Sequence, residues 1–222
     1  MVSHELKTPL TSLKGYVQVL ASKINVNKDV FTQLIIQKVK SQVLKMETMI
    51  SSFLNLSHLE AGKIRIETKV LSLIDLIKQV VQDIEIITQS HPIVIKTCPE
   101  LFVSGDRHKL SQVLANLLSN AAKYSPKASK IEVSCEVFEG HPLVKVRDEG
   151  MGIRQKDLPK LFDRYYRVES QEMKNTSGFG LGLYLSKEII ELHGVSFGPK
   201  VITAKALPVA LRYPCSIDLC WG

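Results

Sequence analysis

The chain has 222 residues and a formal net charge of +7, with 45% hydrophobic and 23% charged residues. These proportions are typical of a globular protein with one or two domains. No apolar run approaches the roughly 20 residues of a membrane-spanning helix, and no secretory signal opens the sequence. The basic residues are dispersed and accompany no nucleic-acid-binding motif, so no nucleic-acid partner is expected.

The cysteines indicate the compartment. Cys98, Cys135, Cys215 and Cys220 form no CxxC pair and no metal-ligand spacing. This pattern predicts reduced thiols in a cytoplasmic protein. Any sensor or membrane anchor, for example in an inner membrane, is expected to lie in a longer parent outside this chain.

Residues 1–62 have the pattern of two amphipathic helices joined by a polar turn at 25–29, and Gly62 is expected to end the second helix. Apolar residues recur at heptad spacing along both helices, at Leu6, Leu10, Leu13, Val17, Leu20 and Ile24 and at Ile35, Val39, Met46, Met49, Phe53 and Leu56. Such a hairpin cannot bury both faces alone, so a homodimer that completes a four-helix bundle is expected. A hairpin packed on the rest of its own chain is the alternative.

A histidine stands at the start of the first helix. The i, i+4 spacing places His4 and Thr8 on one face, with Glu5 beside the histidine. A neighbouring carboxylate can fix the imidazole tautomer and stabilise positive charge, which suits a nucleophile. Pro9 is expected to kink this turn. Taken alone, a segment of this kind is more often a solvated helix start.

From residue 63 the pattern alternates between strands and helices. Strands are expected at 63–70, 92–98, 101–104, 131–138 and 142–147, and helices at 71–89, 106–123 and 183–193. The two strands around residues 139–141 are expected to form a hairpin. This order predicts an α+β two-layer sandwich with a mixed sheet and helices on one face.

The helix expected at 106–123 carries polar residues at one-turn spacing. Asn116 and Asn120 share a face, and Lys123 and Tyr124 lie one turn further on. Two amide oxygens and an ammonium group can hold a magnesium ion and phosphates. An isolated pair of this kind is more often a pair of surface or capping asparagines.

Two glycine-rich segments follow. In DEGMGI (148–153), the glycines allow close backbone approach to a ligand, and Asp148 can accept a hydrogen bond from an adenine amino group. GFGLGL (178–183) runs into a helix whose N-terminus favours phosphate oxygens. Between them lie LFDRYYR (161–167) and a polar stretch expected to act as a mobile lid.

In this order and spacing the segments resemble the catalytic core of a sensor histidine kinase of two-component signalling. SHELKTPL resembles the histidine box of that family, NLLSNAAKYS its asparagine box, DEGMGI and GFGLGL its glycine boxes, and LFDRYYR its phenylalanine box. The resemblance covers residues 1–194. It implies a dimerisation and histidine-phosphotransfer hairpin at 1–62 and an ATP-binding catalytic domain at 63–194.

The resemblance also implies roles for single residues. His4 would accept the γ-phosphoryl group of ATP, with Glu5 as its acid/base partner and Thr8 positioning water to dephosphorylate the partner. Asn120, helped by Asn116, would ligate Mg²⁺, and Arg164 or Arg167 would neutralise charge on the transferring phosphoryl group. The nucleotide contacts would be Lys123, Tyr124, Asp148, Gly150, Gly152, Ile153, Phe162, Gly178, Gly180, Leu181 and Gly182. Phosphohistidine would then pass its phosphoryl group to an aspartate of a response regulator.

The sequence departs from the family after Gly194. Residues 195–222 match nothing in the strand pair that the family pattern has there. When this segment is back-translated into DNA and the reading frame is shifted by one base, however, the encoded residues can read as such a strand pair. We therefore hypothesise a one-base deletion near the codon for Val195. At most poor substitute strands are expected, at Val201, Ile202, Val209 and Leu211, with a destabilised nucleotide domain and weak or absent kinase activity.

Two other functions remain compatible with the sequence. Another ATPase of the gyrase or chaperone kind is disfavoured, because those enzymes use a glutamate base where Asn116 stands and lack the histidine hairpin. A non-catalytic dimerising module that binds a response regulator is the second, and the departure after Gly194 favours it.

Overall fold

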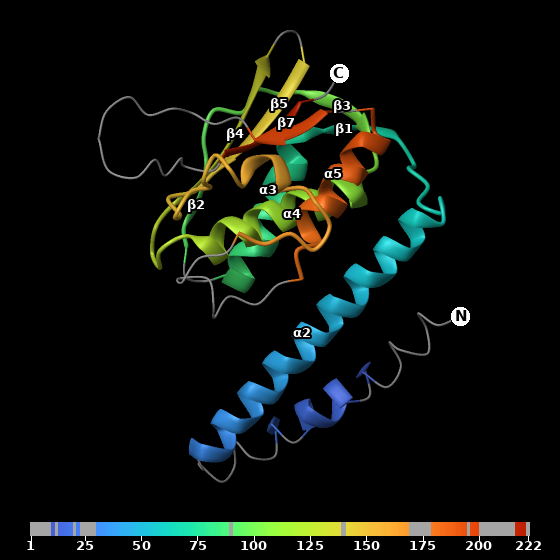
Figure 1. Ribbon diagram of the computed structural model, residues 1–222. Coiled ribbons are helices and arrows are strands. Elements are labelled where there is room, and N and C mark those ends of the chain that lie inside the picture. The colour runs from blue at the N-terminus through green and yellow to red at the C-terminus, as the bar shows by residue number, and fades with distance from the viewer. Residues whose placement is uncertain are drawn as a thin grey trace. The chain divides into compact units, whose positions relative to one another are not determined.

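The computed structural model describes residues 10–11, 13–19, 21–22, 30–88, 91–138, 141–168, 179–194, 196–199 and 216–220 (Figure 1). The chain divides into two compact units, Met1–Ile64 and Arg65–Gly222. The predicted site residues His4, Glu5, Thr8 and Gly178 lie outside the described part. Among the described residues, no helix is long and apolar enough to cross a membrane.

The first unit is helical, as predicted. Its second helix, α2 (Val30–Glu60), pairs with the helical residues described between 10 and 22 through an ion pair of 3.1 Å between Lys14 Nζ and Glu47 Oε2. Gly62, at φ +62°, follows the end of α2. Its N–H donates to the carbonyl of Leu59, and that of Lys63 to the carbonyl of His58. This double hydrogen bond is the Schellman motif, so the predicted stop at Gly62 is confirmed.

The apolar residues of α2 differ in exposure. Val43 and Leu56 are buried, as are Leu10 and Val17 of the preceding helical segment. A second group keeps 37–59% of its surface exposed and consists of Val39, Met46, Met49 and Phe53. The steps of seven, three and four between these four residues place them on one face of the helix. We call these four residues the α2 stripe.

The second unit contains the predicted alternation of strands and helices. In chain order its elements are β1 (Lys69–Ser72), α3 (Leu73–Thr88), β2 (Ile93–Ile95), β3 (Phe102–Gly105), α4 (Arg107–Tyr124), β4 (Ile131–Phe138), β5 (His141–Arg147), the 3-10 helix η1 (Leu158–Lys160), α5 (Gly182–Leu192), β6 (Ser196–Pro199) and β7 (Ser216–Cys220). The strand expected at 63–70 begins only at Lys69, where pairing with Gly105 starts. Alternation alone therefore overestimated β1, because a strand also needs a partner.

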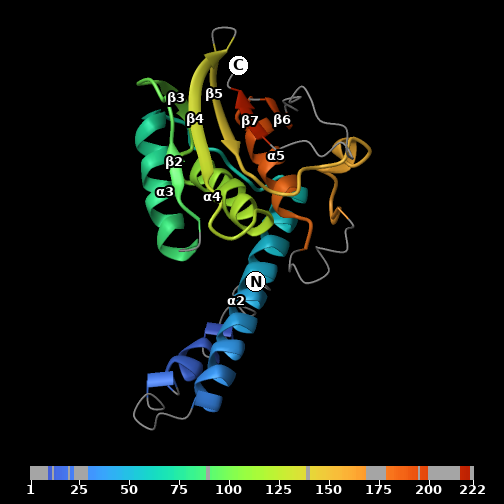
Figure 2. The ribbon, with the colours of Figure 1, turned by 90° about the vertical axis from the view of Figure 1, so that its left-hand side faces the viewer.

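The described strands form a mixed sheet with the order β2-β4-β5-β7-β6, in which β2 and β4 run parallel and the other neighbouring pairs run antiparallel. β1 and β3 form a separate antiparallel pair. Helices α3, α4 and α5 lie on one side of the five-stranded sheet (Figure 2). The predicted two-layer α+β sandwich is confirmed.

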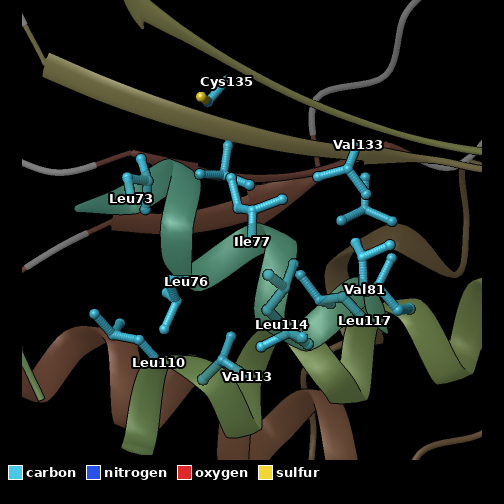
Figure 3. Close-up of a cluster of buried hydrophobic side chains, with 14 of the residues drawn as sticks. Leu73, Leu76, Ile77, Val81, Leu110, Val113, Leu114, Leu117, Val133 and Cys135 are labelled. Carbon is cyan, nitrogen blue, oxygen red and sulfur yellow. The ribbon is translucent and has the colours of Figure 1, made fainter. Parts of the chain in front are cut away.

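The core lies between this sheet and the helices (Figure 3). On β4, Ile131, Val133 and Cys135 are buried while the residues between them face away from the core. Full burial of one large apolar side chain contributes about 1.5–3 kcal/mol. The buried residues of α4 lie on one face of the helix and are Leu110, Val113, Leu114, Leu117, Leu118 and Ala121. Because this face of α4 is in the core, Asn116 and Asn120 lie on the side that is only partly covered.

Two cysteines differ from the prediction of reduced thiols. Cys98 and Cys135 form a disulfide, with their Cα atoms 4.5 Å apart. Cys98 follows β2, Cys135 lies on the neighbouring strand β4, and the N–H of Cys135 donates to the carbonyl of Thr97. The spacing of 37 residues gave no sign of this contact, because strand pairing creates it.

The segment that departs from the family contains two strands. β7 pairs antiparallel with β5, and β6 pairs with β7. The substitute strands were expected at Val201, Ile202, Val209 and Leu211, which all lie outside the described residues. The two strands that the structure contains, β6 and β7, lie before and after those positions in the sequence. β7 can pair with β5 because the backbone groups along β5 need hydrogen-bond partners, and any extended segment can supply them. The one-base deletion stays a hypothesis.

Candidate functional site

The C-terminal half of α4 contacts the first glycine-rich segment. The carbonyl oxygen of Tyr124 lies so near Gly150 that a Cβ there would approach it to 2.8 Å. Real Cβ atoms do not approach a carbonyl oxygen so closely, so the backbone pair requires glycine. Gly152, at φ +68°, then turns the chain toward Ile153. DEGMGI (148–153), the segment predicted to approach a ligand, therefore packs against the C-terminal end of α4.

Asp148 lies between β5 and this turn. Its Oδ1 accepts hydrogen bonds from the N–H of Gly150 (2.7 Å) and the hydroxyl of Ser125 (3.4 Å). Its Oδ2 forms no hydrogen bond within the described part of the chain. Burial raises the pKa of Asp148, and the two hydrogen bonds only partly oppose this effect. A half-buried carboxylate with one oxygen unused suits a ligand that donates a hydrogen bond, such as an adenine amino group.

The second glycine-rich segment contacts α4 at Asn116. The Nδ2 of Asn116 donates to the hydroxyl of Ser186 on α5 at 2.9 Å. A Cβ on Gly182 would lie 2.5 Å from Asn116 Oδ1. Glycine at the first residue of α5 therefore leaves room for the asparagine amide beside the helix N-terminus. Leu181, which precedes α5, is buried and 4% exposed.

The asparagines fit a magnesium ion. Asn116 uses its amide nitrogen on Ser186, which leaves Oδ1 toward the start of α5. The Asn120 side chain is half-buried and forms no hydrogen bond with any other described residue. Among the described residues, no group of three acidic, histidine or cysteine side chains could hold a metal. Magnesium is often held by a few protein oxygens together with phosphates and water, so these two amides suit it.

Lys123 and Tyr124 lie at the last turn of α4. The Lys123 ammonium group is 4.8 Å from the centroid of the Tyr124 ring, within the range of a cation–π contact. Both side chains are partly exposed. The two residues that were predicted to contact phosphates therefore lie next to the turn formed by Gly150.

The phenylalanine box packs against the second glycine-rich segment. Tyr165, at φ +63°, donates its N–H to the carbonyl of Gly180 at 3.0 Å. Arg164 Nη2 donates to the hydroxyl of Tyr184 on α5 at 2.6 Å, with its guanidinium 4.6 Å from the same ring. Phe162 is half-buried and Arg167 is exposed. Arg164, one of the two arginines predicted as alternatives for the phosphoryl group, thus connects the box to α5.

Two structural residues were missed by the sequence analysis. Asp106 caps α4 by accepting from the N–H groups of His108 and Lys109, and its own N–H donates to His193 Nε2 at 3.0 Å. Although burial opposes it, these backbone donors lower the pKa of Asp106. Asp157, between the two glycine-rich segments, is buried at 4% exposure. An Asp that precedes a helix is a recognisable cap, but nothing local predicted the contact with His193.

The site therefore assembles in the second unit around α4. One helix contacts the first glycine-rich segment at Tyr124 and Ser125 and the second at Asn116. Of the predicted nucleotide contacts, all but Gly178 lie in the described part. The predicted phosphoacceptor group of His4, Glu5 and Thr8 belongs to the first unit, and the structure does not describe it.

Comparison with known proteins gives the family. Residues 1–62 match the His Kinase A (phospho-acceptor) domain, and residues 105–206 match the histidine kinase-, DNA gyrase B- and HSP90-like ATPase family. The sensor histidine kinase WalK of Bacillus subtilis is 32% identical over 217 residues, which cover 96% of this chain. The chain belongs to the histidine kinases. Its match to the ATPase family continues past Gly194, to residue 206.

Other histidine kinases show the same relationship. Sensor histidine kinase YkoH of B. subtilis is 33% identical over 95% of this chain. The chain spans 35% of WalK and 46% of YkoH, so it corresponds to less than half of each relative. Solved structures agree in fold, with a TM-score of 0.75 and 19% identity for full-length ShkA in complex with AMPPNP, over 99% of this chain and 44% of that one. The histidine kinase AdeS of Acinetobacter baumannii has a TM-score of 0.65 and 22% identity, over 98% of this chain and 96% of that chain.

Proposed function

We propose that this histidine kinase core transfers the γ-phosphoryl group of ATP to His4 and from there to an aspartate of a response regulator. Glu5 is the acid/base partner of His4. Thr8 positions the water that dephosphorylates the regulator. Because ATP and receiver domains are cytoplasmic, the core works in the cytoplasm, whether or not a longer parent is anchored in a membrane.

The observation that carries the proposal is the double contact of α4. Tyr124 and Ser125 adjoin the turn of Asp148 and Gly150, and Asn116 adjoins Gly182. A ligand that lies along this half of α4 meets a carboxylate acceptor at one end and a helix N-terminus at the other. The first selects a donor such as the adenine amino group, and the second favours phosphate oxygens. ATP combines both features in one molecule.

The remaining contacts are those that the resemblance to the family implies. The free oxygen of Asp148 accepts from adenine, and Gly152 and Ile153 shape the wall beside the base. Lys123 and Tyr124 contact phosphates, as do the backbone groups around Gly178, Gly180 and Leu181. Phe162 supports the segment that carries Arg164.

The chemistry requires neutralisation of phosphate charge. Bound Mg²⁺, held by the amide oxygens of Asn120 and Asn116, would supply part of the positive charge that neutralises the phosphates. Arg164 or Arg167 would supply more at the transferring group. Arg164 is fixed to Tyr184 of α5, which keeps its charge near the start of that helix.

The partners follow from the first unit. The α2 stripe is apolar and exposed within one chain, so a second copy is the surface that would cover it. The resulting homodimer would present His4 on a four-helix bundle to a receiver domain.

The test is phosphorylation of His4. The chain is incubated with γ-labelled ATP and magnesium, and acid-labile, base-stable label is measured together with ATP affinity. We expect label in the wild type, at a low level given the altered segment after Gly194, and none in His4→Gln, which should bind ATP with unchanged affinity.

Other outcomes distinguish the rival functions. Label that persists in His4→Gln would overturn the assignment of His4. ATP binding with release of free phosphate and no label would indicate another ATPase of this fold. A chain that binds no ATP but still dimerises would be a non-catalytic module.

A further inference from the structure

The Asp157 side chain does not have the capping role that its position before a helix would suggest. It precedes the 3-10 helix η1, but its side chain does not cap that helix. Instead the carboxylate is buried and holds two partners. Oδ2 accepts from Arg154 Nε at 2.5 Å, and Oδ1 accepts from the hydroxyl of Tyr166 at 2.7 Å. A buried carboxylate is costly unless such donors satisfy it, so both partners are held firmly.

Tyr166 connects this carboxylate to the second glycine box. A Cβ on Gly180 would lie 2.7 Å from the carbonyl oxygen of Tyr166 and 2.6 Å from the carbonyl carbon of Tyr165. The N–H of Tyr165 also donates to the carbonyl of Gly180. The backbone at 165–166 is therefore in direct contact with Gly180, and a shift of one would displace the other.

Gly180 leads directly to the N-terminus of α5. Only Leu181 separates it from Gly182, the first residue of that helix. Its φ of +68° fixes the direction in which the chain enters the helix. The backbone N–H groups that would bind phosphates follow this turn.

We propose that Asp157 is a positioning residue for the phosphates of ATP, acting through the hydroxyl of Tyr166 on the turn Gly180–Gly182. The inference rests on the proposed function, because it requires ATP with its phosphates at α5. Asp157 does not touch the nucleotide. Its hydrogen bond holds the Tyr166 backbone against Gly180, and so sets the position of the helix N-terminus relative to Asp148.

This role differs from simple stabilisation of the loop. A loop contact would affect unfolding and would weaken binding of adenosine and ATP alike. A positioning contact at the phosphate end affects ATP alone, because adenosine is held at Asp148, on the other glycine box. The ratio of the two affinities therefore separates the two roles.

The experiment compares two adjacent tyrosines. Tyr166→Phe removes the hydroxyl that Asp157 accepts, whereas Tyr165→Phe removes a hydroxyl that forms no hydrogen bond with the described residues. Affinities for ATP with magnesium and for adenosine are measured on the full chain by calorimetry and by NMR titration. We expect Tyr166→Phe to lower the affinity for ATP about threefold to tenfold, as the loss of one hydrogen bond would, and to leave the affinity for adenosine unchanged. Tyr165→Phe should change neither affinity.

A second variant tests whether both residues act through one contact. Asp157→Asn should also lower the affinity for ATP more than that for adenosine. The double variant Asp157→Asn with Tyr166→Phe should lose no more than the weaker-binding single variant. Additive losses would overturn the proposed coupling.

The outcomes are distinct from those of the proposed function. Suppose that the wild type binds ATP, and that Tyr166→Phe lowers the affinities for ATP and adenosine equally or changes neither of them. Asp157 is then a loop contact and this inference is wrong. If the wild type binds neither ligand, the proposed function fails and the inference with it. Circular dichroism of each variant confirms that it is folded.

Discussion

His193 Nε2 accepts a hydrogen bond from the backbone N–H of Asp106, joining the end of α5 to the start of α4 across 87 residues of sequence. Because Nε2 accepts, the other ring nitrogen carries the proton, and it lies 2.7 Å from the carbonyl oxygen of Ile189. Asp106 in turn caps α4. One neutral imidazole therefore holds together the two helices that carry the asparagine box and the second glycine box.

The first prediction follows from this contact. His193→Ala leaves the Asp106 N–H without its acceptor, which should lower the free energy of unfolding by about 1–3 kcal/mol. Urea unfolding followed by circular dichroism measures the change. His108→Ala is the control, since the His108 side chain is exposed and only its N–H binds Asp106. Equal stability of both variants would show that the contact contributes nothing.

The second prediction concerns Asp148. Asp148→Asn should abolish nucleotide binding without loss of stability. If the asparagine keeps its oxygen on Gly150, its amide NH₂ faces the adenine amino group, donor against donor. Burial raises the pKa of Asp148, so its ionised form costs stability above the pKa of the unfolded chain, and the neutral asparagine removes that cost. Thermal unfolding and ATP titration check the two halves, and a variant that unfolds earlier would contradict the argument.

The same shift gives a pH dependence. Affinity for an ATP analogue should fall as the pH drops through the raised pKa of Asp148, and so at a higher pH than an ordinary aspartate would give. Ser125→Ala removes a donor that favours the carboxylate and should move the fall to still higher pH. Ser129 lies on the same loop, and among the described residues its hydroxyl donates only to the carbonyl of Pro126, so Ser129→Ala should leave the curve unchanged. Identical curves for all three chains would rule out Asp148 as the titrating group.

Local patterns predicted much of the fold, and they predicted which residues of the candidate site share a helix face. The periodicity of α4 fixes which face enters the core, and hence that Asn116 and Asn120 share the other face. The hydrogen bond of Asn116 to Ser186, 70 residues away, has no local signal and depends on how α5 packs. The same holds for the Asp106–His193 contact. Spacing therefore predicts which residues share a surface, whereas packing of distant elements decides what they contact.

The third prediction concerns the Cys98–Cys135 disulfide. The loop that it closes contains β3 and all of α4, and the two cysteines are 37 residues apart. Chain entropy over such a loop corresponds to about 4 kcal/mol. Dithiothreitol should therefore lower the melting temperature of the ATP-binding unit, and Cys98→Ala should melt at one temperature with or without it. The double variant Cys215→Ser, Cys220→Ser should keep the full response. A wild type insensitive to reductant would show that the thiols are reduced.

The fourth prediction tests the α2 stripe as a dimer surface. Met49→Glu and Phe53→Glu place charge on side chains that are 49% and 59% exposed in one chain. Charges facing each other at the centre of a bundle would prevent association, so both variants should be monomers by light scattering at micromolar concentration. Gln37→Glu adds the same charge to an exposed position on another face of α2 and should remain a dimer. A monomeric wild type would contradict the dimer itself.

The last prediction concerns the contact between Gly182 and Asn116. In Gly182→Ala the new Cβ would lie 2.5 Å from Asn116 Oδ1, so the amide must move and its bond to Ser186 weaken. The helix should survive, because alanine is a better helix former than glycine by about 1 kcal/mol. The damage should therefore appear as weaker ATP binding in the presence of magnesium, with thermal stability retained.

Two comparisons make this last test specific. Gly15→Ala, in the first unit, meets no atom within 4 Å and should leave ATP binding unchanged. In an Asn116→Ala chain, Gly182→Ala has no amide to displace and should cause no further loss. If Gly182→Ala instead weakens binding equally in both backgrounds, the glycine acts on the nucleotide directly, and the placement of Asn116 beside the helix N-terminus is not what requires a glycine there.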